Sequence, residues 1–296
     1  MLALDLLANG LIYGCFYALM AVGLAMIFGV LKVVNFAHGE FFMIGAYTYV
    51  LVSLKLGVPP WLALPGAAIA GALLGWLVER LLMRPLYAGY ASWGFMKDEY
   101  AVVVTFGLSL LLINLVDKIV GPYSFRGPPL IDVGRFALGP VMLTGQKAIA
   151  AVIAIALMIA LALFIKRSVW GLQIQAVAQN RLGASLAGID ATSTTSLIFI
   201  VSGMLAALSG ALLAPLVNPS PDIGVFPAVK SYVIVVLGGM GSIWGAMIAA
   251  LILGVSEAFF SVYISYDYRD AFGLFILVAV LLLRPQGLLG EKGREV

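Results

Sequence analysis

The sequence predicts an all-α polytopic membrane protein with eight to nine transmembrane helices, and its composition and the length of its apolar stretches lead to this prediction. Of the 296 residues, 63% are hydrophobic and 10% are charged, against about 45–50% and about 25% in an ordinary soluble domain. The mean hydropathy is +1.09. Stretches of roughly 20 apolar residues, long enough to cross the hydrocarbon core of a bilayer, recur along the whole chain. A water-soluble globule is therefore excluded, and we expect one transmembrane domain over 1–296.

The apolar stretches are separated by proline, glycine and charge clusters. They lie at 8–31, 39–55, 60–79, 100–117, 146–165, 195–217 and 269–284. The remaining apolar block, 225–260, is too long for one helix and contains the glycine-rich run 237–242. We expect a short helix at 228–237 and a full helix at 243–260. The pattern leaves open whether the short helix crosses or re-enters.

The positive charges favour nine crossings with the amino terminus outside, because Lys and Arg are enriched in cytoplasmic loops. With eight crossings they divide 9 to 8, which carries no orientation. With nine they divide 10 to 7. The ten would be Lys32, Arg80, Arg84, Lys97, Lys166, Arg167, Arg181, Arg284, Lys292 and Arg294. This topology places the loop 166–194 and the carboxyl terminus in the cytoplasm.

Small residues recur at helical spacing in several spans, and in lipid they let helix backbones approach closely. The stripes are Gly10, Gly14 and Ala18; Gly71 and Gly75; Ser202, Ala206, Gly210 and Ala214; and Gly241, Gly245 and Ala249. They are typical of packing within the chain, with a face against a second subunit as the alternative. Cys15 is the single cysteine, which excludes an intramolecular disulfide.

Polar residues interrupt the apolar sequence between 33 and 40. We expect Asn35, His38 and Glu40 to lie on a translocation path, because non-helical backbone at membrane depth survives only inside protein or beside a wet cavity. The alternative is a short turn at the membrane surface, with Asn35 as a cap. His38 is the only histidine, so we predict no multi-histidine metal site.

A second break is predicted at 238–242, and we assign Gly238, Gly239 and Ser242 to the candidate path as well. Glycines permit a tight turn there. The run is not a phosphate-binding loop, because no Lys-Ser or Lys-Thr pair follows it. No arrangement of catalytic residues is recognisable in the sequence, so we expect neither an enzyme nor ATP binding by this chain.

The segment 166–194 is the longest polar stretch and is expected to be cytoplasmic. Within it, 172–187 is predicted to form one surface helix. Ala178, Leu182 and Leu186 would share one face, with Gln175, Gln179 and Gly183 on the other. Such a helix can dock in the groove of a soluble partner. The alternative is a helix lying on lipid, which the single Arg181 within it disfavours.

Three motifs carry a resemblance to a known family. They are VNFAHGE at 34–40, AVAQN at 176–180 and VLGGMGS at 236–242. Together they resemble the permeases of branched-chain amino-acid ABC importers of the LivH type, over nearly the whole chain. The family pattern often has arginines just before AVAQN, where this chain has Leu172 and Gln175.

The resemblance implies a permease domain that forms half of a translocation path in the bacterial inner membrane. It implies a LivM-like permease partner, two cytoplasmic ATPases that bind the ATP and magnesium, and an extracytoplasmic substrate-binding protein. It also implies that the ATPases are contacted through a coupling segment. That segment comprises Ala178, Gln179, Asn180, Arg181, Leu182, Leu186 and Gly188.

The sequence leaves other cargo open and disfavours another transport mechanism. Similar permeases carry urea, short amides or aromatic acids, and the permease sequence discriminates poorly between them. A secondary transporter would be expected to bury carboxylates in several spans, whereas Glu40 is the only acidic candidate we identify from the sequence. The net charge of +3 shows no footprint for nucleic acid.

Overall fold

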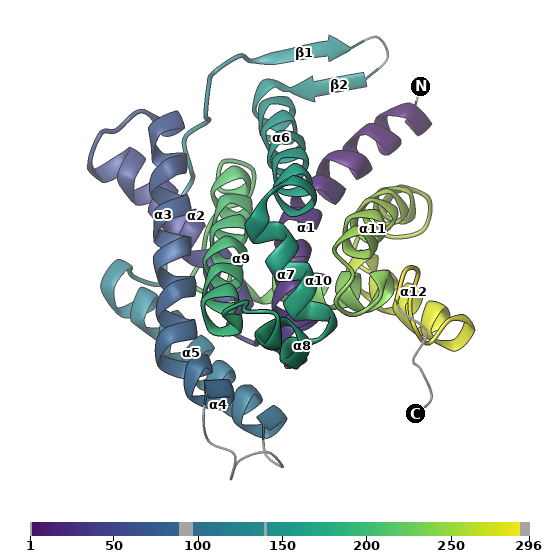
Figure 1. The fold of residues 1–296 in the computed structure, drawn as a ribbon. Coiled ribbons are helices and arrows are strands. Elements are labelled where there is room, and N and C mark those ends of the chain that lie inside the picture. The colour runs from purple at the N-terminus through teal and green to yellow at the C-terminus, as the bar shows by residue number, and fades with distance from the viewer. Residues whose placement is uncertain (1, 89–96, 139–140, 291–296) are drawn as a thin grey trace.

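A computed structural model describes residues 2–88, 97–138 and 141–290, and within them the fold is a helical bundle (Figure 1). Among the described residues, six helices are long and apolar enough to span a membrane. They are Leu2–Leu31 (α1), Pro60–Tyr87, Asp98–Val120, Gly145–Arg167 (α6), Ala191–Leu213 (α9) and Ile243–Tyr263 (α11). The second of these joins α3 (Pro60–Val78), a π-helical segment (Glu79–Met83) and α4 (Arg84–Ala88), and the third lies in α5 (Lys97–Val120).

The remaining helices are shorter. They are α2 (His38–Lys55), α7 (Val169–Gln179), α8 (Arg181–Leu186), α10 (Val225–Gly238) and α12 (Arg269–Leu283). Strands β1 (Arg135–Leu138) and β2 (Val141–Thr144) form an antiparallel hairpin in which Arg135 pairs with Thr144. The sequence did not predict this hairpin.

Each of the nine predicted apolar stretches forms a helix, but the predicted eight to nine crossings are not reached by the six long spans. The difference falls on α2, α10 and α12. At about 1.5 Å per residue, α10 and α12 are about 21 and 22 Å long, less than the roughly 30 Å of a bilayer core. α2 has 18 residues but carries Glu40 and Lys55. These three helices are shorter or more polar than a full span.

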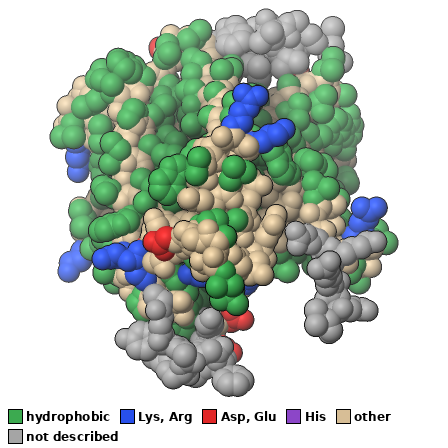
Figure 2. Space-filling model, in the orientation of Figure 1, with side chains coloured by type: hydrophobic (Ala, Val, Ile, Leu, Met, Phe, Trp, Pro, Cys, Tyr) green, Lys and Arg blue, Asp and Glu red, His purple; other side chains and the backbone are tan. Residues whose placement is uncertain are grey.

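Helices α1 and α9 form the centre of the bundle. In the most apolar 18-residue stretch of each helix, 83% of the residues are buried, whereas the share in α5 is 17%. α1 packs against α9 and α11, and α9 packs against α2 and α3 as well. Hydrophobic side chains cover most of the face in Figure 2, with a group of charged and other polar side chains towards its lower end. The outer helices therefore present apolar surface that a bilayer can cover.

Small residues allow this close packing. A Cβ atom on Gly45 of α2 would lie 2.0 Å from the Ala207 carbonyl oxygen of α9. A Cβ atom on Gly75 of α3 would lie 2.2 Å from the Phe199 carbonyl oxygen. Gly10 of α1 meets the backbone of α11 in the same way. The glycines of the predicted stripes thus pack within this chain, which confirms the first of the two interpretations.

The two ends of the bundle differ. α7 and α8 lie at the lower end in Figure 1, whereas the amino terminus and the hairpin lie at the upper end. α4, which carries Arg84, lies towards the same lower end as α8. Lys292 and Arg294, also expected on this side, lie outside the described residues.

The helix packing predicts a selective effect of added volume. Gly45→Ala places a methyl group against the α9 backbone and should lower the free energy of unfolding by about 1–3 kcal/mol, as overpacking does. Gly107→Ala in α5 is the matched control, because a Cβ atom there meets no atom within 4 Å. Thermal unfolding of the detergent-solubilised protein measures both. Equal melting temperatures for the two variants would contradict this packing.

Candidate functional site

The segment 32–37 between α1 and α2 is non-helical, and side chains from two other helices hold its backbone. Val33, Asn35 and Ala37 are buried, whereas Lys32 and Phe36 are exposed. The Phe36 N–H group donates to Thr105 Oγ1 of α5 at 3.0 Å, and the Tyr232 hydroxyl of α10 donates to the Asn35 carbonyl. The Ala37 N–H group donates to Asn35 Oδ1 at 3.1 Å. Lys32, with φ of 58°, makes the reversal after α1. These bonds replace the helix bonds that this backbone lacks.

His38 fixes the depth at which α2 begins. Its side chain is fully buried, and Nε2 lies 3.0 Å from the Met20 carbonyl oxygen. Met20 lies 11 residues before the end of α1, or about 16 Å along the helix. The chain therefore folds back into the bundle after α1, as the predicted broken element requires. The burial of His38 inside the bundle favours this interpretation over the alternative of a turn at the membrane surface.

Glu40 lies two residues further along α2, and its side chain is also buried. Its Oε1 accepts a hydrogen bond from Ser109 of α5 at 2.8 Å. Asn35 Nδ2, His38 Nδ1 and Glu40 Oε2 have no hydrogen-bond partner. Three buried polar atoms with spare bonding capacity thus gather near the amino end of α2. Their role in translocation stays a prediction.

The second predicted path element, 238–242, is a turn between α10 and α11. Gly239 has φ of 102°, and Ser242 caps α11 by accepting from the Gly245 N–H group at 3.0 Å. The Leu289 N–H group donates to the Gly238 carbonyl at 3.0 Å, so the segment after α12 covers the turn. The break is where the sequence predicted it.

The two predicted path elements are not brought together. The turn at 238–242 packs against Gly29 near the end of α1, whereas His38 contacts the middle of the same helix. Gly238 and Gly239 are buried, and Ser242 is half-buried. Any role that the turn has in transport is therefore separate from that of the segment near His38.

The predicted single helix 172–187 is two helices, which corrects the sequence interpretation. Asn180 is extended, with φ of −153° and ψ of 101°, and ends α7. Its Oδ1 accepts a hydrogen bond from the Gly183 N–H group at 2.8 Å and so caps α8. Asparagine is a favoured N-cap residue, and this competing bond breaks the helix.

The break changes the predicted faces of the coupling segment. Leu182 and Leu186 of α8 are 72% and 83% exposed, while Ala178 of α7 is half-buried, so the three do not share one helix face. α7 and α8 attach to the bundle through Ile174, Val177 and Ala184. Gln179, Asn180 and Gly188 are exposed, and Arg181 is half-buried. The outer surface of α8 is thus apolar.

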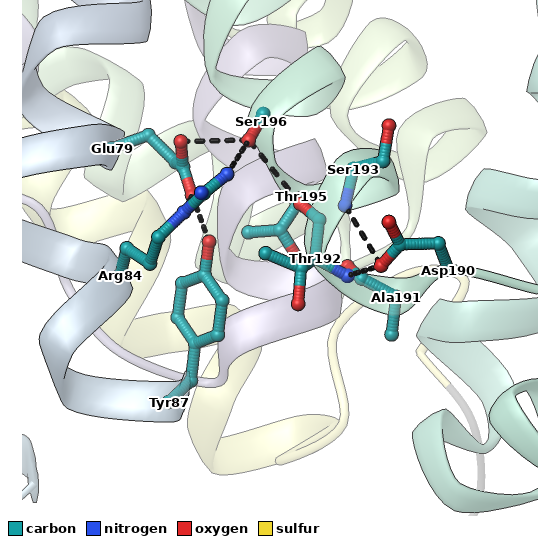
Figure 3. Close-up of polar contacts among 9 residues, drawn as sticks. All are labelled: Glu79, Arg84, Tyr87, Asp190, Ala191, Thr192, Ser193, Thr195 and Ser196. Carbon is teal, nitrogen blue, oxygen red and sulfur yellow. Dashed lines mark hydrogen bonds and ion pairs between the residues drawn. The ribbon is translucent and has the colours of Figure 1, made fainter. Parts of the chain in front are cut away.

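A cluster of polar residues joins α8 to the spans. The Arg181 guanidinium lies 4.4 Å from the centre of the Tyr87 ring, and the Tyr87 hydroxyl donates to Glu79 Oε1. Figure 3 shows Glu79 between Tyr87, Arg84 and Ser196 of α9. Arg84 Nε lies 3.3 Å from Glu79 Oε1, and the Ser196 hydroxyl donates to Glu79 Oε2 at 2.7 Å. We call these five residues the Glu79 cluster.

Sequence reasoning missed the Glu79 cluster and a second buried carboxylate, Glu257. The statement that Glu40 is the only acidic candidate is therefore wrong, because Glu79 and Glu257 are 0% and 3% exposed. The spacing of Glu79 and Arg84 is a usable signal, because they are five residues apart and a π-helical segment bonds residues i and i+5. The described residues contain no group of His, Cys, Asp and Glu able to hold a metal ion.

The bundle of apolar helices, the buried polar segment near His38 and the paired helices at one end define a helical membrane transport protein. The chain belongs to the family described as the permease component of branched-chain amino acid transport systems, whose model matches residues 6–281.

Curated relatives cover the same length. The LivH high-affinity branched-chain amino acid permeases of Escherichia coli K12 and Salmonella typhimurium LT2 are 34% identical over 97% of this chain and 95% of theirs. BraD of Pseudomonas aeruginosa is 33% identical over 99% of this chain and 97% of its own. LivM of Escherichia coli K12 is 26% identical over 92% of this chain and 67% of its own. No solved structure matches.

The Glu79 cluster predicts a loss of stability when one donor is removed. Tyr87→Phe takes a hydrogen bond from a buried carboxylate and should lower the free energy of unfolding by about 1–3 kcal/mol. Tyr123→Phe, at a ring that is 75% exposed, should change it by less than about 0.5 kcal/mol. Thermal unfolding in detergent compares the two variants. A Tyr87→Phe protein as stable as the control would show that Glu79 does not depend on this bond.

Proposed function

We propose that the chain is the permease subunit of an ATP-driven importer for branched-chain amino acids and forms half of the translocation path. The near full-length family match carries this proposal. The exposed apolar surface of α8 at one end of the bundle supports the proposal. A permease that does not hydrolyse ATP needs a surface on which a separate ATPase can dock.

The proposed assembly pairs this chain with a LivM-like permease, two cytoplasmic ATPases and an extracytoplasmic substrate-binding protein. The likeness to both LivH and LivM relatives supports a pair of related permeases. ATP and magnesium belong to the ATPases. We place the complex in the bacterial inner membrane with α7, α8 and the carboxyl terminus in the cytoplasm and the amino terminus outside. The Lys and Arg residues near α7 and α8 support this orientation.

The coupling step is proposed to run through α8. Leu182 and Leu186 would insert in a groove of the ATPase, and Gln179, Asn180 and Gly188 would lie at its edge. Arg181 joins α8 to Tyr87, and Tyr87 joins it to Glu79 at the start of the π-helical segment. Ser196 extends the same contacts to α9. Movement of the ATPase would therefore reach α3 and α9 as a displacement of one connected body.

The path itself is proposed to pass Asn35, His38 and Glu40, whose spare polar atoms can bind the polar ends of an amino acid in turn. Gly238, Gly239 and Ser242 would act at the cytoplasmic end, where their turn meets α1 and the segment after α12. Closing and opening of these two breaks would alternate access to the path.

The test is uptake of radiolabelled leucine by proteoliposomes that contain all the proposed subunits. Leu182→Asp should reduce leucine-stimulated ATP hydrolysis and uptake at least tenfold, because a charge replaces an apolar contact in the docking groove. Ile131→Asp is the matched control: Ile131 is 53% exposed and lies outside α7 and α8, between α5 and β1. Its activity should stay within twofold.

Two results would contradict the proposal. Unchanged ATP hydrolysis and uptake with Leu182→Asp would remove α8 as the coupling element. ATP-dependent uptake of urea or a short amide, without uptake of leucine by the same complex, would replace the proposed cargo.

A further inference from the structure

A second charged cluster lies away from the Glu79 cluster, where α10, α11 and α12 meet α1. Lys230 Nζ of α10 lies 2.6 Å from Glu257 Oε2 of α11 and 2.9 Å from Asp270 Oδ1 of α12. It also donates to the Tyr17 hydroxyl of α1 at 3.0 Å. Lys230 and Glu257 are 9% and 3% exposed. Lys230 thus has three partners and ties four helices together.

A cavity of about 230 Å³ lies beside this cluster, lined by α1, α11 and the start of α12. Its walls combine two opposite charges with aromatic and aliphatic surface. The lining includes Glu257, Arg269, Tyr13, Tyr17, Leu6 and Asn9. Pockets for drug-sized ligands measure about 300–1,000 Å³, so this one suits a smaller molecule.

Both charged residues of the cavity keep a polar atom without a hydrogen bond. Glu257 Oε1 is buried and has no hydrogen-bond partner, although Oε2 of the same carboxylate is bound to Lys230. Arg269 Nε is also buried without a hydrogen bond, although it forms an ion pair with Asp270 Oδ1 at 3.7 Å and the guanidinium lies 5.3 Å from the centre of the Tyr266 ring. A role in helix packing accounts for Lys230. Helix packing does not explain why Glu257 Oε1 and Arg269 Nε are buried without a hydrogen bond.

We propose that this cavity is a binding site for a zwitterionic α-amino acid in the permease itself. Glu257 accepts from the α-ammonium group, and Arg269 donates to the α-carboxylate. Leu6 and the rings of Tyr13 and Tyr17 contact the aliphatic side chain. The choice of a branched-chain amino acid as the occupant rests on the proposed function; the zwitterion follows from the paired charges and their free atoms.

The position of the cavity gives the site a place in transport. Its lining runs from Leu6 to the middle of α1 at Tyr17 and takes in the second half of α11. The amino-terminal end of α1 lies at the opposite end of the bundle from α8 (Figure 1). In the orientation proposed above, this is the external half of the membrane. The site would therefore meet the amino acid after its release from the binding protein.

The test is equilibrium binding of tritiated leucine to the complex of permeases and ATPases in nanodiscs, without the substrate-binding protein. Saturable binding is expected, displaced by unlabelled leucine. N-acetyl-leucine lacks the ammonium group and leucinamide lacks the carboxylate, so each should compete at least tenfold more weakly. Absence of saturable binding would overturn the proposal. So would competition by both derivatives that is as strong as competition by leucine.

Variants locate the site. Arg269→Gln should weaken leucine binding at least tenfold, and Arg269→Lys, which keeps the charge, should restore part of it. Asp132→Asn, at an exposed residue outside the cavity, should leave binding unchanged. Unchanged affinity in an assembled Arg269→Gln complex would overturn the proposal.

Glu257→Gln also removes an ion partner of Lys230. The variant could therefore lose leucine binding because it misfolds, and folding has to be tested separately from binding. The double variant Lys230→Met, Glu257→Met replaces the pair with apolar residues, an exchange that is often neutral for stability. It should assemble normally by gel filtration and bind no leucine. Leucine binding by the assembled double variant would overturn the site.

The proposed function is read out separately by ATP-driven leucine uptake with the binding protein present. Uptake without saturable binding by the permease overturns this site and leaves the importer function standing. Binding without ATP-driven uptake overturns the importer function and leaves the site.

Discussion

Close contact between helix backbones at small residues is the constraint on which the rest of the structure depends. Gly45, Gly71, Gly75 and Gly210 leave no room for a side chain where α9 meets α2 and α3. In lipid, apolar burial gives helices little reason to associate, so such contacts supply the packing. They place α1 and α9 at the centre, and every polar element described above is held against one of these two helices.

The polar elements hold different helices to the centre of the bundle. His38 bonds to the middle of α1, and the Glu79 cluster holds the start of α9 and the end of α3 beside α8. The second charged cluster, around Lys230, joins α10, α11 and α12 to Tyr17, which also lies near the middle of α1. Buried charges cost free energy unless they are paired, so each cluster fixes a joint between helices. In the proposed importer, the Glu79 cluster transmits movement from the ATPase, and the cavity beside Lys230 binds the amino acid.

Most of the fold could be predicted from the sequence because hydropathy is a local property. All nine apolar stretches are helices, and the breaks at 32–37 and 239–242 lie where polar or glycine residues predicted them. The break at Asn180 was missed because the apolar pattern continues through it, while one side-chain bond ends the helix. Glu257 was missed because its partner Lys230 lies 27 residues away on another helix. Glu79 has local partners in Arg84 and Tyr87, but its bond to Ser196 spans 117 residues and could not be predicted from the local pattern. The sequence gives the period along a helix but not which helices meet.

The central claim is that α8 and the adjoining end of the bundle move as one body, driven by an ATPase. It is tested most directly by joining Arg181→Cys to Tyr87→Cys with a short bifunctional maleimide in a Cys15→Ala background, and then measuring leucine uptake by the full complex. The account predicts that uptake continues with the cross-link in place, because these residues stay together throughout the cycle. Loss of uptake on cross-linking, regained when a cleavable linker is cut, would show that α8 must separate from α4 and would contradict the account.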